Sequence, residues 1–445
     1  MPAPALRVAL LGAGTVGREV ARAFDSFPDR LSVDGGPRLV LVGIAVRDLD
    51  RARRSGLPAE LLTDAPAHLV AAPETDVVVE VMGGDEPART LIAAALAAGK
   101  PVVTANKHVI AHHGPELEAI ARASRTALRF EAAVGGGIPI LGVLAADLAA
   151  NRVSRVRGIV NGSTNLVLSR MASDGRAYTD VLAEAQAAGY LEADPSADVE
   201  GLDAANKLAI LIRLAFGVWV DPGAIVRRPS TVGSAALGSA ALGSATAGSA
   251  TAGSPGISGV TAVDIAAAAA LGSAIKLVAD ARRLDDGRIA ASVLPTVVPL
   301  ADPLGRTDGV TNRIEIRGEP IGGVAVSGPG AGGGATSSAI LGDLLAVARG
   351  AGSTWAGLAP AGAAAEGVLV GPPDEAADRG WFAILPGAPP AAVAALPGVQ
   401  LAAVAGGTVV HAPRLAFAAA QAMLRELGAP PDLAILPVDE PMPRR

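Results

Sequence analysis

The chain has 445 residues, of which 50% are hydrophobic and 18% are charged, so it can bury the cores of two or three domains. Its formal net charge of −6, without interleaved aromatic and basic residues, argues against a nucleic-acid partner. The absence of cysteine excludes disulfides, thiolate metal ligands and thiol nucleophiles.

No targeting or membrane segment is predicted. Met1 leads directly into an apolar strand and a glycine-rich turn, without the charged and apolar regions of a signal peptide. The Ala-rich stretch 265–279 contains Lys276 and is flanked by Asp264 and Asp280, so it is too polar to span a membrane. We therefore expect a soluble, cytoplasmic protein with no membrane partner.

The first elements carry a dinucleotide-binding pattern. An apolar strand over 6–11 precedes a glycine-rich turn, and 18–24 follow at helical spacing. In this context glycines let the backbone approach a pyrophosphate, which the helix N-terminus faces; a plain tight turn is the alternative. The candidate cofactor contacts of the turn are Gly12, Gly14, Thr15, Val16 and Gly17.

The second predicted strand, 39–46, favours NADP over NAD. An acidic residue commonly ends this strand and binds the ribose, but here Arg47 follows it, and then Asp48. Arginine suits a 2′-phosphate, and Arg51 lies close by. The alternative is a solvated, Arg-rich helix start.

Further strand–helix pairs predict that residues 1–140 form a Rossmann-type parallel sheet. Ligands of such sheets bind beyond the carboxyl ends of the strands. Gly83, Thr104 and Lys107 lie at or just after strand ends, so they are candidate contacts of the cofactor and, for Lys107, of the substrate. The predicted elements are strands 77–81, 101–104 and 128–132 and helices 91–98 and 140–148.

A polar segment, 189–207, organises the next part of the chain, after a strand at 156–160 and a helix at 180–188. Its loop carries Glu192 and Asp198, and the helix after it carries Asp203 and Lys207 on one face. A solvated ion pair is the alternative for the last two residues, and a helix cap is the alternative for Asp198.

Lysine usage favours a chemical role for Lys207. The chain has only four lysines among its 37 basic residues. A buried lysine can release a proton at neutral pH, whereas arginine cannot. We therefore interpret Lys207 as a proton donor held by Asp203, although codon bias explains the arginine excess equally well.

The rest of the chain contains no further predicted catalytic residues. Glycine recurs every five residues from 233 to 253, which indicates a flexible insertion over 230–256. His108, His112 and His113 are close in sequence, but no HExxH pattern accompanies them, so we expect no divalent metal. The elements expected here are a helix from 265 to about 280, strands at 288–298, 311–316 and 324–326, a glycine-rich turn opening a helix at 337–348, a linker over 351–379, strands at 381–385, near 400–411 and at 433–437, and helices at 390–396 and 414–427.

Taken together, these motifs resemble the homoserine dehydrogenase family over roughly residues 6–350. The resemblance implies NAD(P)-dependent interconversion of L-homoserine and L-aspartate 4-semialdehyde in threonine and methionine biosynthesis. The motifs are Gly12–Gly17, Val78–Gly84, Thr104–Lys107, Glu131–Pro139, Asn161–Asn165, Gly189–Lys207 and Gly328–Gly332.

The resemblance also implies an α/β architecture and site roles. It implies a Rossmann domain over 1–140, an α+β catalytic and dimerisation domain over 141–350 and a divergent, ACT-like α+β domain over 380–445. Lys207 would donate the proton, with Lys107 beside it, and Asp203 and Glu192 would orient the lysines or hold the amino acid. Further residues implied are Tyr190 and Asp198 for substrate, Gly332 for cofactor, and Glu131, Val134, Gly136 and Ile138 for a monovalent cation such as Na⁺.

The same resemblance suggests a homodimer or homotetramer and an amino-acid effector at the C-terminal domain. The insertion departs from the family pattern, and the C-terminal part matches an ACT domain poorly, so inhibition by threonine stays open. The alternatives are a related amino-acid or sugar dehydrogenase and a non-catalytic NADP-sensing regulator. Aldehyde oxidation through a thioester is excluded because it needs a cysteine.

Overall fold

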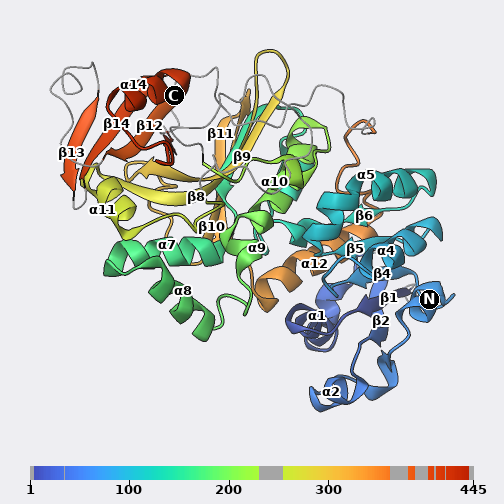
Figure 1. Cartoon of the computed structure of the whole chain (residues 1–445). Helices are drawn as coiled ribbons and strands as arrows, with labels where there is room; N and C mark the ends of the chain where they lie inside the picture. Colours follow the sequence, from blue (N-terminus) through green and yellow to red (C-terminus); the bar gives the residue numbers. More distant parts are fainter. Residues whose placement is uncertain are drawn as a thin grey trace. The chain divides into compact units, whose positions relative to one another are not determined.

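A computed structural model describes residues 5–34, 36–229, 254–360, 379–385, 399–404, 407–415 and 417–439 (Figure 1). The chain forms two compact units. Unit 1 comprises 1–151, 209–221 and 326–365, and unit 2 comprises 152–208, 222–325 and 366–445. Each unit thus combines separate segments of the chain, whereas the predicted domains, 1–140, 141–350 and 380–445, were continuous ranges.

Unit 1 contains the predicted Rossmann-type sheet, sheet A, with six parallel strands in the order β3-β2-β1-β4-β5-β6. Its central strands β1 and β4 are mostly apolar, as is typical of parallel strands covered on both faces, with Arg7 and Glu80 as the charged exceptions. The strand order reverses between β1 and β4, where such sheets bind ligands. The strands are β1 (Ala5–Leu11), β2 (Arg38–Ala45), β3 (Leu62–Thr63), β4 (Val77–Glu80), β5 (Val102–Thr104) and β6 (Leu128–Arg129).

Helices from distant parts of the chain complete unit 1. Helix α12, coloured orange in Figure 1, packs against α1, and its Ile340 and Leu344 join the core of sheet A. The predicted strand 128–132 is shorter than expected, because a 3₁₀ turn begins at Glu131. The helices are α1 (Thr15–Ser26), α2 (Leu49–Arg54), α3 (Pro66–Ala71), α4 (Ala88–Ala97), α5 (Lys107–Ala123), α6 (Ile140–Gly142), continued by a π-helical turn (Val143–Asp147), and α12 (Gly333–Ala348).

Unit 2 is built on a nine-stranded mixed sheet, sheet B, in the order β11-β10-β7-β8-β9-β15-β12-β14-β13. The C-terminal strands extend this sheet through β15, which pairs with β9 on one side and β12 on the other. The strands are β7 (Arg152–Ile159), β8 (Ser273–Arg283), β9 (Ile289–Pro299), β10 (Thr311–Glu319), β11 (Gly322–Pro329), β12 (Arg379–Leu385), β13 (Gln400–Val404), β14 (Gly407–Leu415) and β15 (Leu436–Val438).

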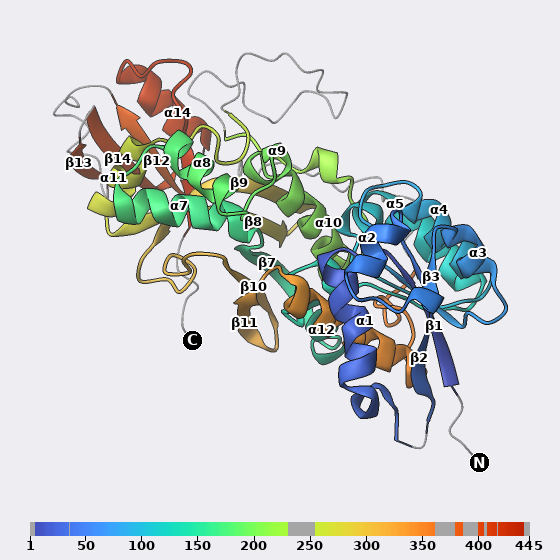
Figure 2. The same cartoon turned by 90° about the horizontal axis from the view of Figure 1, so that it is seen from below.

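Helices pack on sheet B at two places. α7 and α11 contact β8, and Figure 2 shows α14 beside β12 and β14. The predicted helix 390–396 and the insertion over 230–253 lie outside the described residues. The helices are α7 (Gly162–Asp174), α8 (Tyr178–Ala187), α9 (Ser196–Val199), α10 (Leu202–Phe216), of which residues 209–216 belong to unit 1, α11 (Ala262–Ala270) and α14 (Phe417–Glu426).

The predicted helix from 265 to about 280 is wrong in its second half. Helix α11 ends at Ala270, and Gly272 then turns the chain with a φ of +64°. From Ser273 onwards the chain is strand β8, paired with β9 over its whole length. Alanine favours a helix, but eleven cross-strand pairs, most of them with buried side chains, override that preference here.

Among the described residues, no helix combines the length and hydropathy that a membrane crossing requires.

Candidate active site

A large cavity lies at the carboxyl ends of the sheet A strands and encloses about 1240 Å³. The glycine-rich turn after β1 forms part of its wall. A side chain at Gly12 would come within 2.7 Å of the Val81 carbonyl oxygen, and one at Gly17 within 2.1 Å of the Gly12 carbonyl oxygen. Only glycine therefore permits this turn, which leaves the backbone open to a pyrophosphate.

Five of the residues predicted to bind the cofactor line this cavity: Gly12, Gly14, Thr15, Arg47 and Gly83. Gly332 precedes α12, and the next residue, Gly333, lies against Thr15 and Glu19 of α1. Val16 and Gly17 are in the first turn of α1. Lys107 is the first residue of α5.

The end of β2 carries positive charge towards the cavity. Arg47 and Arg51 both line it. The Asp48 carboxylate caps α2 by accepting a hydrogen bond from the Arg51 backbone N–H at 2.8 Å. The one acidic side chain directly after this strand end is thereby engaged in a helix cap.

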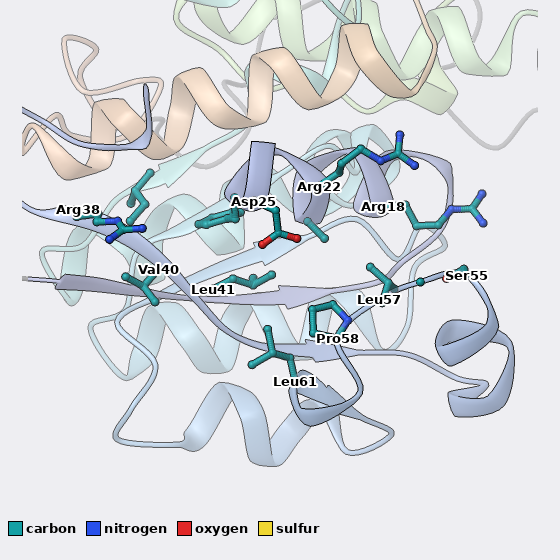
Figure 3. A pocket seen from close by; sticks show the side chains of 14 residues that line it. Arg18, Arg22, Asp25, Arg38, Val40, Leu41, Ser55, Leu57, Pro58 and Leu61 are labelled. Carbon is teal, nitrogen blue, oxygen red and sulfur yellow. The ribbon is translucent and has the colours of Figure 1, made fainter. Parts of the chain in front are cut away.

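A second, smaller cavity of about 270 Å³ lies between α1, β2 and the segment 55–61 (Figure 3). Arg18 and Ser55 line both cavities. Figure 3 shows the Asp25 carboxylate above an apolar floor that includes Leu41 and Leu61. None of the residues predicted from the sequence as site residues lines this cavity.

In unit 2, Lys207 and Asp203 form a buried ion pair. The Lys207 Nζ lies 2.7 Å from Asp203 Oδ2 and donates to the Val160 carbonyl oxygen at 2.7 Å. The two side chains are only 10% and 7% exposed. This burial excludes the solvated ion pair that the spacing alone left open.

Asn161, at the junction of β7 and α7, holds the carboxylates of this cluster. Its Nδ2 donates to Asp198 Oδ1 at 2.6 Å and to Asp203 Oδ2 at 2.8 Å. Its Oδ1 caps α7 by accepting from the Thr164 N–H at 2.9 Å. Asp198 therefore belongs to the same cluster. No individual role for Asn161 was predicted from the sequence, although a polar residue between a strand and a helix is a signal for a helix cap.

Tyr190 and Glu192 lie between α8 and α9 with exposed side chains. The backbone of this segment is fixed: Ser163 Oγ donates to the Tyr190 carbonyl at 2.8 Å, and Gln186 Nε2 donates to the Glu192 carbonyl at 3.1 Å. Both side chains are thus presented from a tethered loop.

The predicted cation loop surrounds a partly buried glutamate, Glu131. Glu131 accepts backbone hydrogen bonds from Leu141 and Gly142 at 2.8 and 2.7 Å. Burial, with the Asp343 carboxylate nearby, raises the pKa of Glu131 to about 7, although these backbone donors oppose the change. Val134, Gly136 and Ile138 follow in a tight turn, in which Gly136 has a φ of +58°.

Within the described parts of the chain, no group of three or more His, Cys, Asp or Glu side chains is arranged to hold a metal ion. Two of the three histidines of α5, His108 and His113, instead lie near Asp85. His113 Nε2 lies 2.8 Å from Asp85 Oδ1, and the His108 and His112 rings are 4.3 Å apart.

A Rossmann-type sheet with a dinucleotide-sized cavity, and a buried lysine–carboxylate cluster, define a nicotinamide-dependent oxidoreductase. Residues 12–131 match the family model described as the NAD-binding domain of homoserine dehydrogenase, and residues 139–345 match the model of homoserine dehydrogenase. The homoserine dehydrogenase of Mycobacterium tuberculosis is 43% identical over 346 residues, which are 77% of this chain and 72% of that protein. That of Corynebacterium glutamicum is 42% identical over 352 residues, 78% of this chain and 73% of that protein.

Solved structures of homoserine dehydrogenases are also similar to this chain. A homoserine dehydrogenase from Thiobacillus denitrificans superposes with a TM-score of 0.81 at 32% identity, with 98% of each chain covered. A hyperthermophilic archaeal homoserine dehydrogenase in complex with NADPH gives a TM-score of 0.60 at 28% identity, covering 77% of this chain and 97% of that one.

The chain belongs to the homoserine dehydrogenase family. It is an NAD(P)-dependent oxidoreductase that acts on a CH–OH group and interconverts L-homoserine and L-aspartate 4-semialdehyde. The function predicted from the motifs is confirmed, and the two alternatives are not supported.

Proposed function

We propose that Lys207 is the proton donor of this reaction and that Asp203 holds it in place. The observation that supports this is the buried Lys207 Nζ, fixed by Asp203 and the Val160 carbonyl. When bound, the nicotinamide supplies a hydride to the carbonyl carbon of the semialdehyde. The Lys207 ammonium gives one proton to the carbonyl oxygen, and its charge stabilises the alkoxide that forms.

The amino-acid end of the substrate needs a carboxylate partner. We propose Glu192 for the substrate ammonium, with Tyr190 and Asp198 as further contacts and Lys107 acting beside cofactor and substrate. In support, the loop of Tyr190 and Glu192 is tethered to α7 and α8 by Ser163 and Gln186.

We propose NADP as the preferred cofactor. Arg47 and Arg51 line the cavity at the end of β2, while the neighbouring carboxylate of Asp48 is engaged as a helix cap. Arginine at this position suits a 2′-phosphate. The relative solved with NADPH is consistent with this preference.

We also propose that a monovalent cation such as Na⁺ binds at Glu131, Val134, Gly136 and Ile138. Glu131 and Asp343 bring two carboxylates to this region, and Arg129 is bonded to Asp343 at 2.7 Å. A cation beside Glu131 would stabilise its carboxylate and so oppose the effect of burial, which raises the pKa of this side chain. It would have a structural role here, stabilising the turn.

We propose a cytoplasmic homodimer or homotetramer with a divergent ACT-like region at 380–445 that takes an amino-acid effector. Light scattering of the purified chain tests the first, and steady-state rates with and without threonine test the last.

The catalytic assignment is tested with Lys207→Met. Turnover should be abolished while NADPH binding stays near normal, because the proton donor is removed and the nucleotide cavity is not. Lys276→Met is the matched control: Lys276 is also buried in unit 2 and bonded to an aspartate, Asp308, at 2.7 Å. Retained turnover in Lys207→Met would contradict the assignment.

A further inference from the structure

Glu80 is a buried carboxylate at the end of β4, where the strand order of sheet A reverses. Its residue is 0% exposed, and it lies in register with Leu11 of β1 and Thr104 of β5. The rest of β4 is valine, so nothing in the strand itself requires an acid. A buried carboxylate is costly unless its oxygens are satisfied, so its partners reveal what it does.

The partners of Glu80 belong to the loop after β4 and to β5. Oε1 accepts the Met82 N–H at 2.7 Å and the Gly83 N–H at 3.3 Å, and Oε2 accepts the Thr104 hydroxyl at 2.6 Å. Burial raises the pKa of the Glu80 carboxyl, and these donors oppose that change because they bind the anion. Met82 and Gly83 both line the cofactor cavity.

The contacts continue to the start of α5. Thr104 Oγ1 accepts the Asn106 N–H at 2.9 Å, and Asn106 Nδ2 donates to the Gly84 carbonyl at 2.8 Å. Asn106 Oδ1 in turn caps α5 by accepting the Val109 N–H at 3.2 Å. The helix that this cap begins opens with Lys107.

We propose that Glu80 is a positioning residue for the reaction. Its carboxylate fixes the Met82–Gly84 loop against the nucleotide and, through Thr104 and Asn106, fixes the backbone that carries Lys107. The proposal rests on the cofactor cavity and the Lys107 role proposed above. Since one group holds both, its loss should affect nucleotide affinity and turnover together.

The test is Glu80→Gln, which keeps the size of the side chain but replaces one of its two acceptor oxygens with an NH₂, so that either Thr104 or the Met82 and Gly83 N–H groups lose their acceptor. The Kd for NADPH should rise by roughly 10- to 100-fold, as expected for a lost hydrogen bond to a charged group, and kcat should fall. The KM for homoserine should change little. Thr104→Val should give the same changes, and the double variant should add little to either, because the two residues form one contact.

Glu118→Gln is the matched control. Glu118 is a buried glutamate of α5 that accepts from Arg213 and Trp219, away from the Met82–Gly84 loop. This variant should lower the melting temperature but leave the NADPH Kd unchanged.

A Glu80→Gln enzyme with wild-type NADPH affinity would overturn the proposal. If that variant does not fold, wild-type NADPH affinity in Thr104→Val would overturn it instead. Full turnover in Lys107→Met would contradict the role of Lys107 without changing the nucleotide result, so the two failures can be told apart.

Discussion

Arg47 is an exposed cation placed where the adenosine ribose of a dinucleotide lies in this fold. Arg47→Ala should raise the KM for NADPH by about 10-fold, because one charge-assisted hydrogen bond is lost, and should leave the KM for NADH nearly unchanged. Steady-state rates with both nucleotides measure this. Arg53→Ala is the control, since Arg53 pairs with Asp50 on the surface of α2. Equal effects on both nucleotides would refute the preference for NADP.

Glu131 should make stability depend on pH. Its pKa is raised from 4.5 to about 7 in the folded protein, so the folded state prefers the protonated side chain. Relative to the ionised form, the stability that this side chain contributes is therefore complete below pH 4.5 and is lost as pH rises through 7. The change amounts to about 3 kcal/mol. Urea unfolding from pH 5 to 8 should show the wild type losing stability relative to Glu131→Gln, which cannot ionise.

The proposed cation predicts how this pH effect responds to salt. Na⁺ bound beside Glu131 would favour the carboxylate, so replacing choline with Na⁺ should reduce the loss of stability at pH 8. The same exchange should leave Glu131→Gln nearly unaffected. If the stabilities of the wild type and Glu131→Gln change in parallel with pH, burial does not raise the pKa of Glu131.

At the scale of elements, the junction of β7 and α7 has two functions, because Asn161 both caps a helix and binds Asp198 and Asp203. Asn161→Ala should lower the free energy of unfolding by about 1 kcal/mol through the lost cap. It should also lower kcat by roughly 10-fold or more, since Asp203 loses a donor that orients it. Thr261→Ala removes the cap of α11 and is the control: a similar loss of stability with full kcat is expected. If both variants keep full kcat, Asn161 has only a structural role.

The elements also show which parts of the site could be predicted from the sequence. The pairing of Asp203 with Lys207 is local, because residues four apart share a helix face, and the turn at Gly12 is fixed by local sterics. The contact of Asn161 with Asp198 joins residues 37 apart, so no periodicity could indicate it. The strand β8 was missed for the same reason: its pairing with β9 is non-local, and it overrides the helix preference of alanine.

At the scale of the whole chain, strand β15 of the C-terminal region belongs to sheet B, and the residue after it is part of a buried charge network. Asp439, directly after β15, binds Arg157 of β7, and its other oxygen accepts from Arg155 at 3.0 Å. Arg157 is also bound by Asp302 and Glu315, both at 2.7 Å. Strand β7 leads to the Val160 carbonyl that holds Lys207, so the C-terminal end of the chain is linked by charge to the strand that carries the site.

This link predicts that the C-terminal region is required for stability and for turnover. Asp439→Asn should lower the free energy of unfolding by about 2–3 kcal/mol, somewhat less than a fully broken buried pair, because Arg157 keeps two carboxylates. It should also lower kcat under conditions in which the variant is still folded, because β7 loses the ion pairs that Asp439 makes with it. Asp432→Asn, an exposed neighbour in the same segment, should change neither quantity. Urea unfolding and steady-state rates measure both, and if the two variants behave alike, the charge network does not connect the C-terminal strand to the site.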